Sequence, residues 1–263
     1  MHINIIYLFI IILYTLFSHF VWAQTVNNKN KSELTVEADE SLEWFEKEKY
    51  YLAKGNVVLK KDGIILKANV VKANYVYKNG ENILQKILAK DKVVLTKKNI
   101  RATGQYMKYN FKNKIAKISG PFQTLLSPSG YLESRKSIIF DDLKNKAEAD
   151  GNVKIVLSNK TVIYADNLKA DFELNDKSLK KAIASGNVII ENPIKKRKSK
   201  ADLGIYKSKN NIIELFGDVI IVNKDSSISG SKGVTNLKTG ISKIIGDPKN
   251  KKRVKGTFAP INK

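Results

Sequence analysis

One short motif recurs along almost the whole chain and constrains the fold more than any other feature. The motif is the triplet Gly-Asn-Val or Gly-Asp-Val, which occurs four times. Degenerate versions that begin at Asp91, Gly120 and Gly246 bring the number of copies to seven, spaced 29 to 36 residues apart. A repeat with such a period indicates that each copy supplies one supersecondary unit and that neighbouring units share a continuous core. The near-identical copies each lead into an apolar run: Gly55-Asn56-Val57, Gly151-Asn152-Val153, Gly186-Asn187-Val188 and Gly217-Asp218-Val219.

A second landmark precedes these triplets, a small residue that is usually followed by Asp or Asn. The clearest copies are Ala38-Asp39, Ala165-Asp166 and Ala201-Asp202. Two landmarks in a constant order are typical of a structural repeat. We therefore interpret the recurring aspartates as turn or edge residues rather than catalytic groups, since the sequence does not establish a close carboxylate pair.

Between the landmarks the pattern is typical of short strands. In the first unit Gly55-Asn56 reads as a turn before a β-branched run, and Asp62-Gly63 reads as the tight turn after it. Polar centres such as Asn79-Gly80 supply further turns, because Asn and Gly tolerate positive φ. Residues 40–50 are rich in Glu and Lys, but the repeat register predicts a strand at 42–45, a turn at 46–49 and a return strand.

The expected fold class is all-β with antiparallel connections, because loops this short cannot make parallel crossovers. Each unit supplies two or three strands, which gives roughly 14 to 18 in all. We see no linker and therefore predict a single body over residues 24–248, preceded by a leader at 1–23 and followed by a basic, flexible tail at 249–263.

The leader has the character of an export signal. Residues 3–17 are almost continuously apolar, and Val21 and Ala23 are the small residues that a signal peptidase reads before a cut at Gln24. The alternative is an uncleaved anchor, since residues 3–22 approach the ~20 residues that a spanning helix needs. In both cases the rest of the chain lies outside the cytoplasm.

The composition limits the chemistry open to the chain. The 263 residues contain no Cys and only two His, His2 and His19, both in the leader. Without the leader there is no Ser–His or Cys–His nucleophile pair and no thiolate or imidazole ligand for a metal. We therefore expect no enzyme activity, no cofactor and no metal site. The net charge of +22 predicts an anionic partner, and export makes nucleic acid a poor one.

Three segments in order carry a family resemblance: 34–39, an extended strand ending in Ala-Asp; 52–59, a Gly-Asn-Val strand; and 64–69, an Ile-x-Leu-x-Ala-Asn strand. In this arrangement the chain resembles the OstA-like family of periplasmic lipopolysaccharide-transport proteins. The resemblance implies an elongated, twisted, half-open antiparallel β-jelly roll that holds the acyl chains of lipopolysaccharide (LPS) between two sheets. It also implies a periplasmic location and a bridge between inner and outer membranes. The implied partners are membrane-anchored and outer-membrane components of the export machinery, together with head-to-tail copies of the chain.

Alternate strand positions independently predict an apolar lining for a lipid groove. Burying a methylene contributes about 0.8 kcal/mol, so a twelve-carbon chain could gain roughly 10 kcal/mol. The alternative is an ordinary packed core between two sheets. The predicted lining comprises Leu34, Val36, Val57, Leu59, Ile64, Leu66, Val93, Leu95, Phe122, Val153, Ile155, Ile163, Val188 and Ile190.

A basic cluster near the start of a strand is a candidate site for the anionic headgroup. It comprises Lys195, Lys196, Arg197 and Lys198. The alternative interpretation is solvated surface whose charges keep strands from aggregating.

Three functions remain open at this point. The first is a carrier driven from elsewhere, because the chain has no Gly-x-x-x-x-Gly-Lys phosphate-binding motif; a membrane-anchored partner of the same export system is a variant of it. The second is a structural or adhesive exported β-repeat protein with a filled core. The third is a polysaccharide lyase or hydrolase on a β-scaffold.

Overall fold

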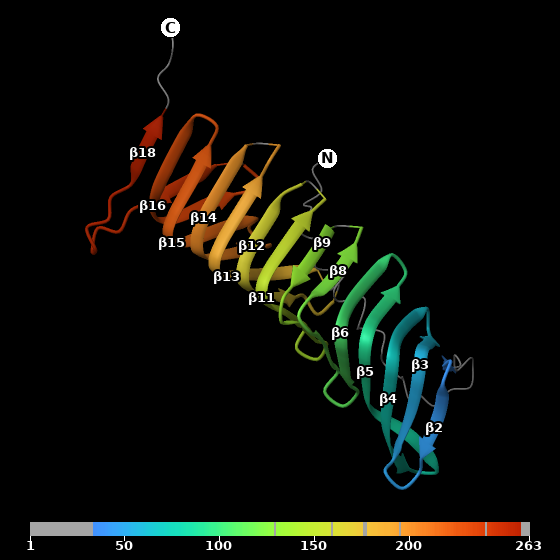
Figure 1. The fold of residues 1–263 in the computed structure, drawn as a ribbon. Helices are drawn as coiled ribbons and strands as arrows, with labels where there is room; N and C mark the ends of the chain where they lie inside the picture. The colour runs from blue at the N-terminus through green and yellow to red at the C-terminus, as the bar shows by residue number, and fades with distance from the viewer. Residues whose placement is uncertain are drawn as a thin grey trace. The chain divides into compact units, whose positions relative to one another are not determined.

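The computed structural model describes residues 34–128, 130–158, 160–175, 178–194, 196–239 and 241–258. The leader lies outside these ranges. Every helix or strand assigned within them is a β-strand, and the strands pair antiparallel (Figure 1). The all-β, antiparallel prediction is therefore confirmed. None of the described residues forms a helix that is long and apolar enough to cross a membrane.

The described residues divide into two compact units, where the sequence predicted one body. The amino-terminal unit contains residues 34–128 and 133–147, and the carboxy-terminal unit contains 130–132 and 148–258. Strand β9 (Gly130–Ser134) and strand β11 (Lys146–Leu157) contain residues of both. Each unit is described by itself below.

The amino-terminal unit is a meander of long hairpins. Its strands are β1 (Thr35–Glu37), β2 (Ser41–Phe45), β3 (Tyr50–Lys61), β4 (Ile64–Lys78), β5 (Glu81–Lys97), β6 (Ile100–Asn110), β7 (Ile115–Ser119), β8 (Gln123–Ser127) and β10 (Ser137–Asp141). The strand, turn and return predicted over 42–53 are confirmed, with Phe45 opposite Tyr50 and Leu42 opposite Ala53.

The carboxy-terminal unit repeats the hairpin pattern from β11 onward. Its further strands are β12 (Val162–Phe172), β13 (Leu179–Asn192), β14 (Arg197–Lys207), β15 (Ile212–Asn223), β16 (Ser226–Asn236), β17 (Ser242–Ile245) and β18 (Lys255–Phe258). Strand β18 lies in the segment predicted as a flexible tail, and it pairs with β16.

The Gly-Asn-Val triplets lie inside long strands and not ahead of them. In β3, Lys54 is opposite Val70 and Val57 is opposite Ala68, so Gly55 and Asn56 lie between the two paired segments with φ of 80° and 41°. The same shift in register occurs at the triplets of β13 and β15. The predicted turn is therefore wrong at these triplets. The two residues form a bulge, which bends a strand without ending it.

The aspartate that precedes a triplet accepts a hydrogen bond from the asparagine in the bulge of the same repeat. The side-chain amide of Asn56 donates to the carboxylate of Asp39 at 2.8 Å, and that of Asn187 donates to Asp166 at 2.9 Å. Glycine is needed beside Asn56, because a Cβ on Gly55 would lie 2.8 Å from the backbone nitrogen of Glu40. These contacts give the recurring aspartates a structural role.

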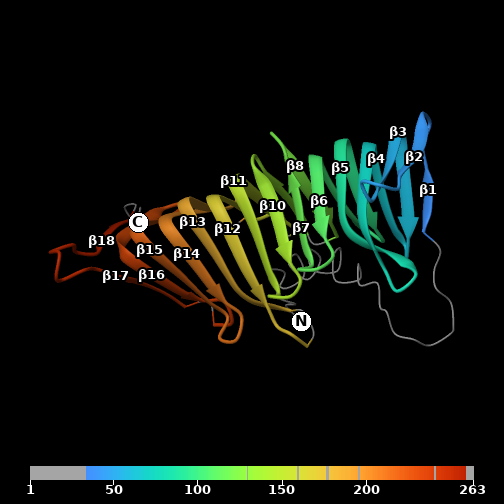
Figure 2. The same ribbon diagram turned by 90° about the horizontal axis from the view of Figure 1, so that it is seen from below.

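The bulges organise each unit into two facing layers. A long strand such as β4 or β13 curves near its middle, so its two halves contribute to different layers of the same unit (Figures 1 and 2). In the amino-terminal unit the layers enclose buried Leu66, Leu95 and Tyr109. Burial raises the pKa of the Tyr109 phenol above its ordinary value, and the nearby Asp142 adds to that shift.

Candidate functional site

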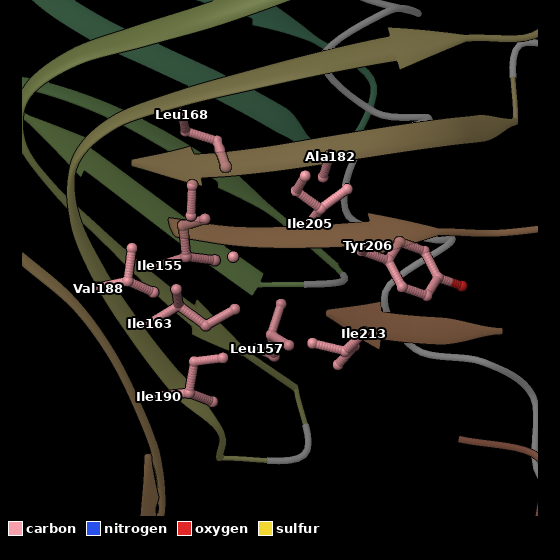
Figure 3. Close-up of a pocket in the computed structure, with 12 residues that line it drawn as sticks. Ile155, Leu157, Ile163, Leu168, Ala182, Val188, Ile190, Ile205, Tyr206 and Ile213 are labelled. Atoms are coloured by element: carbon pink, nitrogen blue, oxygen red, sulfur yellow. The ribbon is translucent and has the colours of Figure 1, made fainter. Parts of the chain in front are cut away.

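The carboxy-terminal unit contains an open apolar cavity with an empty volume of ≈ 640 Å³ (Figure 3). Side chains from five strands, β11 to β15, contribute to the wall. The lining residues are Ile155, Leu157, Ile163, Leu168, Ala182, Ala184, Val188, Ile190, Gly204, Ile205, Tyr206 and Ile213.

The bulges are what bring these residues around one space. Strand β13 contributes Ala182 and Ala184 from the segment before its bulge, and Val188 and Ile190 from the segment after it. Strand β12 likewise contributes on both sides of its own irregularity. Because a bulged strand bends, both halves face the interval between the two layers.

The wall of the cavity offers almost no polar chemistry. Tyr206 carries the one polar side chain among the lining residues, and its hydroxyl oxygen points away from the neighbouring aliphatic groups in Figure 3. That hydroxyl donates to the side-chain oxygen of Asn211 at 3.4 Å, a long hydrogen bond. The cavity therefore selects a ligand by apolar area, since removal of apolar surface from water is the main attraction it can offer.

Four of the predicted lining residues meet in this cavity: Ile155, Ile163, Val188 and Ile190. Their exposure differs, since Val188 is only 1% exposed while Ile163 and Ile190 are half-buried. A fifth, Val153, is buried on the same strand as Ile155.

Most of the predicted lining residues of the amino-terminal unit are buried in its interior. Leu59 lies opposite Leu66, which in turn lies opposite Leu95. Val36 is half-buried opposite Leu59, and Leu34 is also half-buried. The exposed fractions of Val57, Leu59, Ile64, Leu66, Val93 and Leu95 are all between 0 and 4%.

Phe122 occupies a different environment from the rest of the predicted lining. It lies just before β8 and is 40% exposed, and the guanidinium of Arg135 lies 4.7 Å from the centre of its ring. The buried side chains at this point are those of Gln123 and Leu125. Phe122 therefore does not belong to the buried inner row.

Several cavity residues that precede a triplet were not predicted from the sequence. Ala182 and Ala184 lie before the bulge of β13, and Ile213 lies before that of β15. If the triplet is taken as a turn, these residues fall outside the strand that follows it. The sequence signal for them is the alternation of apolar residues upstream of the triplet, as in Ile213-x-Leu215.

The predicted headgroup cluster falls at the β13–β14 hairpin. Lys195 lies outside the described residues, and Lys196 is exposed in the turn. The Nε of Arg197 donates to the side-chain oxygen of Asn223 at 2.9 Å, and Lys198 forms an ion pair with Glu191. Two members of the cluster are thus held by polar neighbours on adjoining strands.

Several carboxylates of the carboxy-terminal unit pair with lysines. Glu214 accepts hydrogen bonds from Lys207 and Lys232, which lower the pKa of its carboxyl group. Asp218 pairs with Lys252 at 2.9 Å. Across the described ranges, no group of three or more His, Cys, Asp or Glu side chains could hold a metal ion.

The described residues form an antiparallel β-fold with an aliphatic cavity, an arrangement suited to an apolar ligand. The family model described as "LptA/(LptD N-terminal domain) LPS transport protein" matches residues 35–125 and 132–241. These ranges make up more than half of the chain, so the chain belongs to this family of LPS-transport proteins. The resemblance to the OstA-like family is thereby confirmed.

Two further comparisons add little to this assignment. The crystal structure of LptH, the LptA-homologous periplasmic component of the lipopolysaccharide transport device of Pseudomonas aeruginosa, is similar at 12% sequence identity. The match covers 87% of this chain and 96% of that chain, with a TM-score of 0.23, and a score this low supports no structural argument. The comparison with curated proteins gave no match.

Proposed function

We propose that the chain is a periplasmic carrier that shields the acyl chains of LPS and helps to bridge the inner and outer membranes. The observation that carries the proposal is the aliphatic cavity between the layers of the carboxy-terminal unit, in a chain of the LPS-transport family. Photocrosslinking from cavity positions such as Ile190 to LPS tests it. An absence of lipid adducts there would count against a carrier.

The chemistry of the cavity supports transport rather than turnover. The twelve lining residues are eight isoleucines, leucines and valines, two alanines, one glycine and one tyrosine, and none of them is charged. Each acyl methylene buried there contributes about 0.8 kcal/mol. Such a site holds a lipid by area alone, and a lipid held without covalent or directional bonds can be passed on when a similar apolar surface is offered.

The proposed partners are LPS and the membrane-anchored and outer-membrane components of the export machinery. The basic cluster of Lys195, Lys196, Arg197 and Lys198 stays a prediction as a headgroup contact.

Head-to-tail self-association is part of the proposal. Strand β2 pairs with β3, and its Leu42 and Trp44 are 62% and 58% exposed. An edge strand with apolar side chains is a template for a further strand. We expect oligomers whose size rises with concentration in analytical ultracentrifugation, and we expect Leu42→Lys to shift them toward monomer.

The matched control for self-association is Leu174→Lys, in the β12–β13 turn, where Leu174 is 71% exposed. This variant adds the same charge away from the β2 edge and should leave the oligomers unchanged. A strictly monomeric wild-type chain at high concentration would contradict the proposal.

A further inference from the structure

One outward face of the amino-terminal unit is rich in lysine. Strands β4, β5, β6, β7 and β10 follow one another in this layer (Figure 2), and one row of directly opposite residues crosses them: Lys72, Leu88, Lys108, Lys117 and Ile139. Directly opposite residues share a face of the sheet. Lys108 and Lys117 are exposed between buried neighbours on their own strands, so the row faces outward.

Residues of the flanking rows add to this face, because side chains two positions apart on a strand point the same way. Lys86 therefore lies beside Leu88 on β5, and Tyr106 lies beside Lys108 on β6. Leu88 and Tyr106 are 36% and 42% exposed. We call the following five residues the lysine face: Lys86, Leu88, Tyr106, Lys108 and Lys117.

The positive charge of the lysine face is not neutralised by its neighbours. Lys86, Lys108 and Lys117 form no ion pair with any residue that the structure describes. Asp141 of β10, two positions from the residue opposite Lys117, pairs with Lys144 instead. Lys108 and Lys117 are directly opposite, with Cα atoms about 5 Å apart, and like charges in this position destabilise a sheet. An anionic surface against the face would offset this repulsion.

The residue types of the lysine face fit an anionic bilayer better than a protein partner. Protein interfaces are enriched in arginine and depleted in lysine, whereas a membrane with anionic headgroups attracts both cations. Tyrosine is enriched at the boundary between membrane and water, where its ring lies at the level of the headgroups. Tyr106 and Leu88 are exposed among the lysines, so all of these side chains can meet the same flat surface.

We propose that the lysine face docks the amino-terminal unit on the surface of a bilayer that carries anionic phospholipid headgroups. Each lysine close to such a surface strengthens binding about fivefold, so Lys86, Lys108 and Lys117 together contribute about 100-fold. The inference goes beyond the proposed carrier function, because it concerns an outer face of the unit and not the interval between the layers.

The test is co-sedimentation of the full chain with extruded vesicles at low ionic strength. The wild-type chain should bind vesicles of phosphatidylcholine and phosphatidylglycerol at least about tenfold more tightly than vesicles of phosphatidylcholine alone. The triple variant Lys86→Gln/Lys108→Gln/Lys117→Gln should bind the anionic vesicles about 100-fold more weakly. Binding of the wild-type chain to soluble poly-glutamate but not to anionic vesicles would overturn the proposal in favour of an acidic protein partner.

The matched control is the triple variant Lys67→Gln/Lys98→Gln/Arg101→Gln. These three residues are exposed and belong to the other layer of the same unit, beyond the bulges of β4, β5 and β6. The net charge falls by the same amount, but binding should weaken by no more than about threefold, since charges farther than a Debye length from the bilayer are screened. Equal weakening by the two triple variants would overturn the lysine face.

A fluorescent label identifies the face that meets the bilayer. The chain has no Cys, so Leu88→Cys and Leu126→Cys each provide a single site for an environment-sensitive fluorophore. Leu126 is 51% exposed and lies opposite Arg101, on the outer face of the other layer. Anionic vesicles should shift the emission of the label at position 88 to the blue and leave that at position 126 unchanged. Binding without a shift at position 88, or equal shifts at both positions, would overturn docking through the lysine face.

Discussion

Gly55→Ala is expected to destabilise the amino-terminal unit by about 3 kcal/mol, through strain and a steric clash together. The residue has φ of +80°, and its new Cβ would lie 2.6 Å from Cγ and 2.8 Å from the backbone nitrogen of Glu40. Backbone at that distance cannot rotate away as a side chain can. The bulge or the segment after Asp39 must therefore shift, and urea unfolding followed by circular dichroism measures the cost.

Gly80→Ala is the matched control for this substitution. Gly80 belongs to the same unit and has the same φ of +80°, but nothing lies within 4 Å of an added Cβ. The control should lose only about 1 kcal/mol, the cost of the left-handed conformation for alanine. The difference between the two variants measures the steric requirement of the bulge. Equal losses would show that the close approach of Glu40 does not restrain the strand.

Ala184→Phe is expected to weaken binding of an acyl chain about 50-fold, because a phenyl group in the cavity displaces about three methylenes at ~0.8 kcal/mol each. Ala184 lines the cavity on β13, and Gly204 lies directly opposite on β14. Because the cavity is open to solvent on one side, the ring can extend outward, and the fold should be retained. Titration with dodecyl maltoside measures the effect without a charged headgroup.

The control for the filled cavity is Ile220→Phe. Ile220 lies next to buried Val219 on β15 and is itself 40% exposed, so its side chain is on the outer face. The substitution enlarges an apolar residue in the same unit without a change of charge, and binding should stay within about twofold of wild type. Unchanged binding by Ala184→Phe would show that the acyl chain lies elsewhere.

The repeat in the sequence was sufficient to predict the fold class but not how the strands bend. Hairpin turns such as Asp62-Gly63 and Asn79-Gly80 were predicted correctly, because those residue types adopt positive φ. Gly55-Asn56 has the same local signature, with both residues at positive φ, yet the chain continues as β3 on the far side. Bulges and turns share their local chemistry, and only the pairing with β4 distinguishes them.

The ambiguity between a bulge and a turn also explains which cavity residues could be predicted from the sequence. Residues from the valine of a triplet onward, such as Val188 and Ile190, follow the alternation of an ordinary strand and were predicted as lining. Ala182 and Ala184 precede the triplet and are too small to stand out in an apolar pattern. Which of the inward residues border an open cavity depends on side-chain packing across the layers, which alternation along a strand does not encode.

Site-specific photocrosslinking tests the central claim most directly. A photoreactive amino acid would replace Ile163 or Ile190, half-buried lining residues of the cavity, and in a separate variant the outward Ile220. After irradiation of cells that make the chain together with LPS, the account predicts LPS adducts from Ile163 and Ile190 and none from Ile220. No adduct from the cavity positions, or equal yields from all three, would contradict it.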